Sequence, residues 1–225
     1  MIHGVAELVE MQMGDEPLSQ MLNRASHKLM DEIAAQQQLL AAENGRLELE
    51  MADALSQPLL EELVALYTMQ ATDRGCEVCL SPEAENFLLV TDTAVLGRVL
   101  GNMIKNALEA CAVGDTVTVG SRSANGRAYF WVHNPTFMRP PVQRQVFLRS
   151  FSTKGAQRGL GTYSMRLLSE RFLGGRVSFA TDPTDGTTFT AVYPLRPDHP
   201  AAQMTTPKRE TAVAHTIPLS IIFAS

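Results

Sequence analysis

Apolar residues in the first part of the chain recur at steps of three and four residues. They mark one face of a helix over residues 18–43, at Leu18, Leu22, Ala25, Leu29, Ile33 and Leu40. Asp15 and Pro17 provide a start signal, and Asn44 with Gly45 provides a break after the pattern. The spacing therefore predicts an amphipathic helix with a narrow apolar stripe.

A second helical pattern follows this break and extends from Leu59 to Gly75. Ser56 and Pro58 could alternatively start a separate shorter helix, and one continuous long helix is a further alternative. Two helices with narrow apolar stripes cannot bury those stripes alone. We therefore expect residues 1–75 to form a helical segment that dimerises into a bundle.

After Gly75 the pattern changes to short alternating runs with helices between them. Strands are predicted at 76–80, 87–91, 116–122, 127–133, 176–181 and 187–193, and helices at 93–111, 142–148 and 162–173. This order is typical of a two-layer α/β arrangement. We place this domain at residues 76–195. Residues 196–225 turn to Pro, Thr, Ala and Lys without periodicity, and we interpret them as a mobile tail.

The composition is that of a folded protein, with 45% hydrophobic and 19% charged residues. A formal net charge of -5 excludes the global basic field that draws a chain to nucleic acid or anionic lipid. The longest late apolar stretch, residues 217–224, is interrupted by Pro218 and Ser220 and is far shorter than the ~20 residues of a membrane span. We therefore expect a cytoplasmic chain with no membrane span and no nucleic-acid partner.

The chain has three cysteines, and Cys76 with Cys79 forms a C-x-x-C pair. Such a pair could hold a metal or act in redox chemistry. No second pair of ligands follows at a suitable spacing, and residues three apart in a strand point to opposite faces. We interpret these residues as reduced core thiols.

The helix predicted at residues 93–111 carries a polar pair on an otherwise apolar surface. Asn102 and Asn106 are four residues apart and so share one face, with Lys105 beside them. Amide oxygens suit Mg²⁺, which binds few protein oxygens and keeps waters and phosphate oxygens. The alternative is that both amides cap or bridge buried backbone groups.

A polar loop leads directly into the helix predicted at residues 162–173. It contains Lys154 and then the run Arg158-Gly159-Leu160-Gly161. Glycines let backbone N–H groups approach an anion, and a helix N-terminus adds free donors and a positive dipole end. This junction suits a polyphosphate, to which Lys154 and Arg158 would add positive charge. A flexible surface turn is the alternative.

The order of these features resembles the ATP-binding domain of sensor histidine kinases, whose superfamily includes gyrase, heat-shock chaperone and mismatch-repair ATPases. The matching motifs are N-x-x-x-N, a strand ending in Asn134, F-x-x-x-F-S-T-K-G, R-G-L-G-T and D-G-T-T-F. The resemblance implies an α+β fold: a two-layer sandwich of a mixed, mainly antiparallel sheet with helices on one face. A helical dimerisation segment would precede it.

The resemblance also implies ATP and Mg²⁺ as cofactors and a set of site residues. They are Asn102, Lys105, Asn106, Asn134, Lys154, Arg158, Gly159, Leu160, Gly161 and Thr187. Asn106 would be the Mg²⁺ ligand and Asn102 a phosphate-side contact. Lys154 would be a lid contact, the two glycines of R-G-L-G-T the turn that cradles phosphate, and Gly186 with Thr187 neighbours of the adenine.

Two positions depart from patterns in the superfamily. The usual D-x-G-x-G at the adenine site is replaced by Asn134-Pro135-Thr136-Phe137-Met138. A neutral amide oxygen at Asn134 can still accept from the adenine amine, but its bond is weaker than that of a carboxylate. The ATPases of the superfamily carry a Glu base four residues before the metal-binding Asn, where this chain has Asn102. Because an amide cannot take a proton from water, the site favours phosphoryl transfer over hydrolysis.

A histidine kinase needs a nucleophilic His on its dimerisation helix. The run Ser26-His27-Lys28-Leu29 partly resembles the family's S-H-E-L-R-T-P-L, and the helical spacing places His27 opposite Leu18, on an exposed face. We take His27 as the candidate phosphoacceptor, with a solvated surface His as the alternative. The function implied is a homodimeric kinase that autophosphorylates and passes the phosphoryl group to a response-regulator receiver domain. The competing hypothesis is an ATP-binding module without its own acceptor.

Overall fold

A computed structural model describes residues 26, 30, 33–34, 36–37, 39–148 and 161–197. The chain divides into two compact units, Met1–Glu48 and Leu49–Ser225. Every described residue of the first unit between Ser26 and Glu43 is helical. Gly45 follows this helix with a φ of 67°, and Arg46 N–H donates to the Ala41 carbonyl at 2.8 Å. The predicted break at Asn44-Gly45 is thus confirmed as a glycine-terminated helix end.

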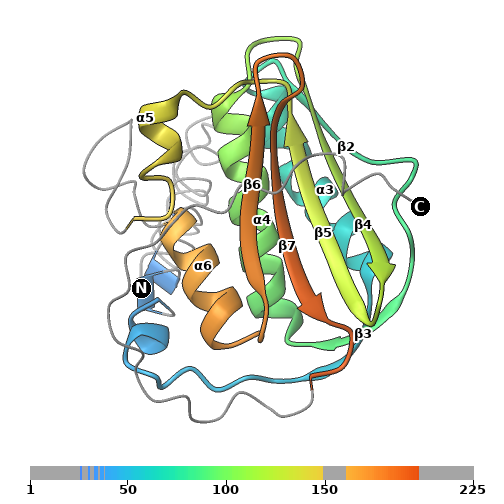
Figure 1. The fold of residues 1–225 in the computed structure, drawn as a ribbon, viewed down its shortest axis with the longest axis vertical. Helices are drawn as coiled ribbons and strands as arrows, with labels where there is room; N and C mark the ends of the chain where they lie inside the picture. Colours follow the sequence, from blue (N-terminus) through green and yellow to red (C-terminus); the bar gives the residue numbers. More distant parts are fainter. Residues whose placement is uncertain are drawn as a thin grey trace, which may run out of the picture. The chain divides into compact units, whose positions relative to one another are not determined.

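The second unit contains a five-stranded sheet in the order β2-β4-β5-β7-β6 (Figure 1). Its strands are β2 (Glu77–Leu80), β4 (Thr116–Ala124), β5 (Arg127–Asn134), β6 (Arg176–Asp182) and β7 (Gly186–Pro194). The β2–β4 pair is parallel and the others are antiparallel. The sheet is therefore mixed and mainly antiparallel, as predicted. A separate two-stranded sheet joins β1 (Ala52–Leu55) to β3 (Leu88–Thr91).

Helices α3 (Ser56–Thr72), α4 (Thr93–Ala110) and α6 (Gly161–Arg171) pack with the sheet, and a short helix α5 covers Pro140–Gln143. Figure 1 shows α3 and α4 behind the sheet. The core lies between these layers. The predicted two-layer α+β fold is confirmed for this unit. In the described part of the chain, no helix is long and apolar enough to cross a membrane.

Helix α3 belongs to the sheet-containing unit, because it packs against β2 and α4. It starts at Ser56, as one of the sequence alternatives predicted, but Ser56 does not cap it. The Ser56 hydroxyl donates to the Glu85 carbonyl and accepts from Phe87 N–H, each at 3.0 Å. Gly75, with a φ of 70°, lies just beyond the helix end. The sheet-containing unit therefore begins at Leu49, upstream of the boundary at residue 76 that the sequence pattern predicts.

Helix α4 is the central helix of the core. Asp92 caps its N-terminus by accepting from Val95 N–H at 2.9 Å, and Asp92 also accepts from Glu50 N–H at 2.9 Å. A Cβ at Gly101 would lie 2.8 Å from the Tyr67 hydroxyl, so α3 and α4 approach closely there. The side chains that α4 buries are Val95, Leu96, Val99, Leu100, Met103, Ile104, Ala107 and Leu108.

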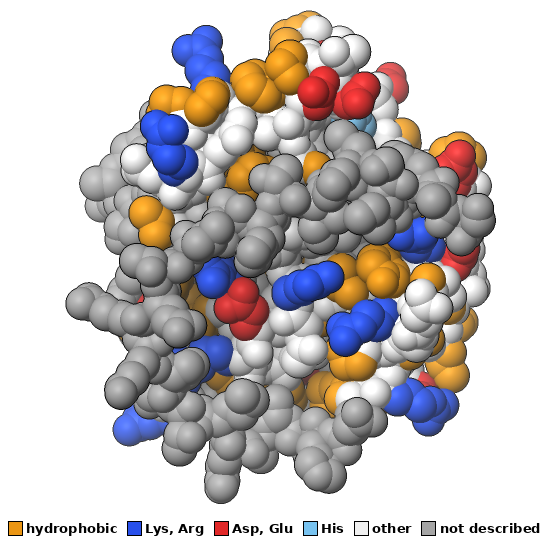
Figure 2. All heavy atoms as spheres, viewed as in Figure 1, with side chains coloured by type: hydrophobic (Ala, Val, Ile, Leu, Met, Phe, Trp, Pro, Cys, Tyr) orange, Lys and Arg blue, Asp and Glu red, His pale blue; other side chains and the backbone are white. Residues whose placement is uncertain are grey.

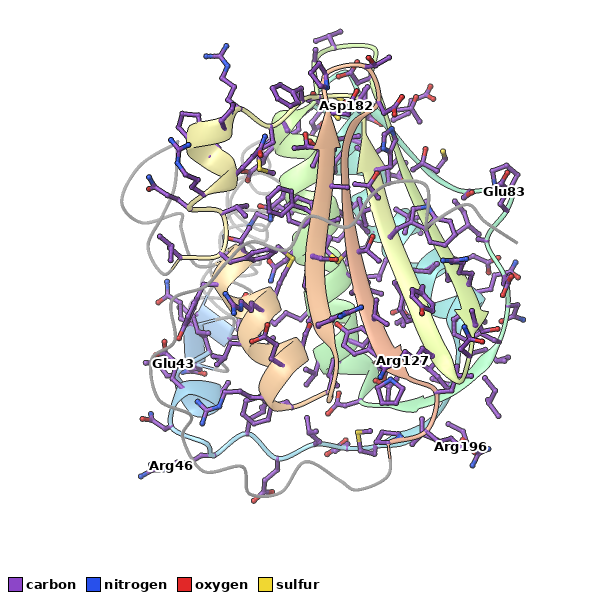
Figure 3. The ribbon with its side chains drawn as sticks, in the orientation of Figure 1. Glu43, Arg46, Glu83, Arg127, Asp182 and Arg196 are labelled. Atoms are coloured by element: carbon purple, nitrogen blue, oxygen red, sulfur yellow. The ribbon has the colours of Figure 1, made fainter. Side chains whose placement is uncertain are left out.

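Successive side chains of the sheet strands point alternately towards the helical layer and towards the opposite face. In β5 the side chains of Ala128, Phe130 and Val132 are buried, while Tyr129 and Trp131 between them are half-buried. Gly120 is the cross-strand partner of Trp131, and a Cβ at this position would overlap the indole ring. Figure 3 labels Arg127 and Asp182, which mark opposite ends of this sheet.

The cysteines confirm one expectation and correct another. Cys76 is buried and Cys79 is exposed, so the C-x-x-C residues do point to different environments. The interpretation of both as core thiols was wrong for Cys79, which lies on the exposed side of the edge strand β2. Burial, followed by the charge of Asp115 and the neighbouring Cys76, raises the pKa of Cys111 to about 12. This thiol therefore stays protonated and unreactive at neutral pH.

Two further elements differ from the sequence prediction. Strand β1 was not predicted, and the helix predicted at residues 142–148 is replaced by α5 and a series of turns. The four residues of β1 contain Ala, Asp, Ala and Leu, which have little strand preference, so the pairing with β3 and not the local sequence determines this strand. Pro140 and Pro141 fit the first turn of a helix, which explains the earlier start of α5.

Substitution of two glycines by alanine should have opposite effects on stability. Gly120→Ala should lower the free energy of unfolding by about 1–3 kcal/mol, because the new methyl group displaces Trp131. Gly97→Ala places a methyl group in open space on α4 and should raise the free energy of unfolding by about 0.5–1 kcal/mol. Urea denaturation followed by circular dichroism measures both. A Gly120→Ala protein as stable as wild type would contradict the Trp131 contact.

Candidate nucleotide-binding site

Two amide side chains of α4 face the N-terminal turn of α6. A Cβ built on Gly161 would lie 3.6 Å from Asn102 Oδ1 and 4.0 Å from Asn106 Oδ1. The two oxygens thus approach one point from successive turns of the same helix, as the N-x-x-x-N spacing requires. The structure confirms that Asn102 and Asn106 share a face and brings them to Gly161.

A chain of hydrogen bonds connects Asn102 to this turn. Asn102 Nδ2 donates to Ser164 Oγ at 3.1 Å, and Ser164 Oγ donates to the Gly161 carbonyl at 2.8 Å. Ser164 is 7% exposed, so this bond is shielded from water. The amide nitrogen of Asn102 is therefore engaged, while its oxygen remains on the Gly161 side.

Asn106 offers its oxygen in the same way. Its Nδ2 atom is buried and has no hydrogen-bond partner among the described residues, which is unusual for a buried donor. The donor set around Gly161 fits a hydrated Mg²⁺ held by few protein oxygens and completed by phosphate oxygens. Within the described residues there is no cluster of three or more His, Cys, Asp or Glu side chains that could hold a metal.

A second polar group lies where β5 ends and β7 begins. Asn134 is the cross-strand partner of Thr187, and both are at least nine-tenths buried. Met138 N–H donates to Thr181 Oγ1 at 3.0 Å, and Thr187 Oγ1 donates to the Thr136 carbonyl at 2.7 Å. Because Thr187 donates its own proton there, Thr181 must donate in the 2.8 Å bond between the two hydroxyls. This relay fixes the 135–138 loop against β6 and β7.

The same end of the sheet is tightly constrained around Asn134. Gly186 has a φ of 82°, and a side chain there would collide with the Asn134 carbonyl and with Pro135. The Nδ2 atom of Asn134 is buried and finds no hydrogen-bond partner within the part of the chain that the structure describes. The backbone around Asn134 is thus fixed, while part of its side-chain hydrogen-bonding capacity remains free for a ligand.

Helix α4 connects the two polar groups. Thr136 Oγ1 donates at 3.0 Å to the carbonyl of Ala110, which is four residues beyond Asn106. Four residues of an α-helix correspond to about 6 Å along its axis. The amides of α4 and the threonine relay therefore lie close to one another through a rigid element.

Phe147 packs the segment before residue 149 onto the core. Its ring centroid lies 5.9 Å from that of Phe179 and 6.3 Å from that of Phe189, the latter at an edge-on angle of 89°. These residues belong to β6 and β7, which also carry Thr181 and Thr187. The first Phe of the F-x-x-x-F motif is thus anchored beside the threonine relay.

The structure covers the predicted site in part. Asn102, Asn106 and Gly161 come together, Lys105 is half-buried on α4, and Asn134 pairs with Thr187. His27, Lys154, Arg158, Gly159 and Leu160 lie outside the described residues. Sequence analysis missed Ser164 and Thr181. Their only signal was a hydroxyl on an otherwise apolar face, which does not name a partner that is far away in sequence.

Comparisons with known proteins agree with this geometry. Residues 91–197 match the family described as histidine kinase-, DNA gyrase B-, and HSP90-like ATPase. The sensor protein DegM of Bacillus sp. (strain B21-2) is 28% identical over 61% of this chain and 37% of its own length. The sensor protein CopS of Pseudomonas syringae pv. tomato is 27% identical over 43% of this chain and 19% of its own. The match thus covers well under half of either relative.

Solved structures share the fold. Full-length ShkA in complex with AMPPNP has a TM-score of 0.67 at 22% identity, over 86% of this chain and 42% of that protein. The Acinetobacter baumannii histidine kinase AdeS has a TM-score of 0.64 at 14% identity, over 86% of this chain and 93% of that protein. The second unit therefore has the fold of this ATP-binding class. Residues 91–197 form an ATP-binding domain of the sensor histidine kinase type.

The stability of the protein should depend on pH through His133, which lies next to this site. Its Nδ1 atom lies 3.0 Å from Thr188 Oγ1. Burial lowers the pKa of His133, and the charge of Asp185 opposes this effect only partly. The unfolded chain binds the proton more readily, so stability is full above pH ~6.5 and falls as the pH drops from there towards the lowered pKa. His133→Gln should flatten this part of the curve. Urea denaturation of both proteins across this pH range is the test, and parallel curves would contradict it.

Proposed function

We propose that this chain acts as an ATP-dependent sensor histidine kinase of a two-component system. ATP·Mg²⁺ would bind between α4, the start of α6 and the β5–β7 end of the sheet. The observation that carries this proposal is the convergence of the Asn102 and Asn106 oxygens at Gly161. It supports a cation and phosphates at this point, because amide oxygens suit Mg²⁺ and a helix N-terminus suits phosphate.

Each part of the site has a proposed role. Asn106 would hold Mg²⁺, which neutralises the developing charge of the phosphoryl groups when it is bound. Lys105 would lie beside the phosphates. Lys154 would act as a lid contact, and Arg158, Gly159, Leu160 and Gly161 would form the turn that cradles phosphate. Asn134 and Thr187 would face the adenine, where the amide of Asn134 has unused hydrogen-bonding capacity.

The site favours transfer over hydrolysis. The position four residues before Asn106 is occupied by an amide whose nitrogen is bound to Ser164. An amide cannot act as the general base that activates water for hydrolysis. A neutral His is already a nucleophile and can attack the phosphoryl group without that base. This supports a kinase reaction over an ATPase reaction.

The acceptor and the partners are proposed from the sequence. His27 on the N-terminal helical segment would receive the phosphoryl group and pass it to a response-regulator receiver domain. The helical residues upstream of Leu49 would also form a homodimer, because α3 is packed within the sheet-containing unit. Both relatives are sensor proteins, which supports this assignment. The competing proposal is an ATP-binding module that phosphorylates a partner or none, which the partial motif around His27 favours.

Labelling with γ-labelled ATP and Mg²⁺ tests the first proposal. Wild type should gain an acid-labile label, His27→Gln should lose it because the nucleophile is gone, and Asn106→Ala should lose it because the cation is no longer held. His3→Gln is the matched control, since it removes a histidine upstream of the predicted helix.

The outcomes separate the hypotheses. ATP binding that depends on Asn106 without any label would support the module instead of the kinase. Label retained in His27→Gln would contradict His27 as the acceptor. Absence of ATP binding by the wild-type chain would contradict both.

Asn134→Asp should have opposite effects on the free protein and on ATP binding. The free protein should lose stability, because a buried carboxylate without a hydrogen-bond partner is costly. ATP should bind about 5- to 10-fold more tightly, since a charged acceptor forms a stronger bond to the adenine amine.

Calorimetric titration and thermal melts with and without ATP measure these two effects. Asn134→Leu, which removes both polar atoms, is the control and should weaken ATP binding. Unchanged or weaker ATP binding by Asn134→Asp would place the adenine elsewhere.

A further inference from the structure

We propose that Ser164 is a positioning residue that fixes the amide of Asn102 with its oxygen towards the cation side of the nucleotide site. This inference rests on the proposed binding of ATP·Mg²⁺. It adds a residue on α6 that no motif of the sequence identifies. It also assigns Asn102 the role of an acceptor, where the family resemblance implied a phosphate-side contact.

The hydrogen bonds of Ser164 determine whether its hydroxyl donates to Asn102 or accepts from it. Its hydroxyl has one proton, and that proton is donated to the Gly161 carbonyl at 2.8 Å. Towards Asn102 the hydroxyl can then only accept, and it does so from Nδ2 at 3.1 Å. Rotation of the amide by half a turn would place two acceptors against each other. The Ser164 hydroxyl therefore selects one of two amide orientations that otherwise differ little in shape.

The selected orientation determines what Asn102 can bind. Its Oδ1 lies 3.6 Å from the position that a Cβ on Gly161 would occupy, and Asn106 Oδ1 lies 4.0 Å from that same position. An amide oxygen attracts a cation or a cation-bound water and repels a phosphate oxygen. With the opposite orientation, the Asn102 NH₂ group would instead face the site and disfavour a cation. Ser164 thus controls the sign of the partial charge that Asn102 presents.

Burial gives this control its strength. Ser164 is 7% exposed, so little water competes for the hydroxyl where α6 packs on α4. Ser169, about one turn and a half further along α6, is also buried but binds the Tyr193 hydroxyl at 2.7 Å, within the core. Its loss therefore tests damage to α6 without any change at Asn102.

The test compares nucleotide affinity in the presence of EDTA with that in the presence of Mg²⁺. ATP titrations would be run on wild type, Ser164→Ala, Ser164→Thr and Ser169→Ala. Ser164→Ala should reduce the Mg²⁺-dependent gain in affinity by about 3- to 10-fold and leave the affinity in EDTA within about twofold. Ser164→Thr keeps the hydroxyl and should keep the gain. Ser169→Ala should keep it despite a lower melting temperature.

Two results would overturn the proposal. One is a wild-type Mg²⁺-dependent gain in Ser164→Ala, and the other is an equal loss of affinity with and without Mg²⁺. The second result would indicate damage to the site as a whole.

A measurement without nucleotide keeps this inference separate from the proposed function. The side-chain ¹H–¹⁵N resonances of Asn102, identified by their loss in Asn102→Ala, should shift in Ser164→Ala and stay in place in Ser169→Ala. Unmoved resonances in Ser164→Ala would contradict the positioning role even if ATP binds. If the wild-type protein binds no ATP but the Asn102 resonances shift in Ser164→Ala, the proposed function is contradicted. The hydrogen bond between Ser164 and Asn102 is then still established.

Discussion

The structure depends on a conflict within helix α4, which must bury an apolar surface and also carry two amides. Its apolar side chains fill the centre of the core, and their burial stabilises the unit through the hydrophobic effect. Asn102 and Asn106 lie on the same helix and cannot move to solvent without removing those side chains from the core. A polar group in this position is tolerated when it is hydrogen-bonded. Asn102 meets this condition through Ser164, whereas the nitrogen of Asn106 does not.

Helix α4 also links the two ends of the proposed site. Asp92 fixes its first turn, and its last turn accepts a hydrogen bond from Thr136. The threonine relay then continues from that loop into β6 and β7. Displacement of α4 would therefore disturb both the amides and the loop next to Asn134. A site built on elements coupled in this way keeps its geometry before a ligand binds, which lowers the entropic cost of binding.

Local patterns of the sequence predicted the elements, and contacts between distant residues determined the rest. The periodicity of α4 and the alternation in β4 to β7 each specify one element from its own residues. Gly75 marks the break after α3 for a similar reason, because its left-handed backbone is a local requirement. By contrast, β1 forms only because β3 lies beside it. The bonds of Ser164 to Asn102 and of Met138 to Thr181 span 62 and 43 residues, and neither spacing leaves a periodic trace.

The proposed site offers amides at Asn102, Asn106 and Asn134. An amide is a donor at one end and an acceptor at the other, so its chemistry depends on which neighbour holds it. A carboxylate at the same position would accept hydrogen bonds in either orientation. At Asn102 the neighbour is Ser164, whereas no described residue binds the nitrogens of Asn106 and Asn134. Ligand groups could therefore complete the hydrogen bonding of these two amides. Amides carry no net charge, so the charge of the phosphates would be balanced by Mg²⁺ and by basic residues.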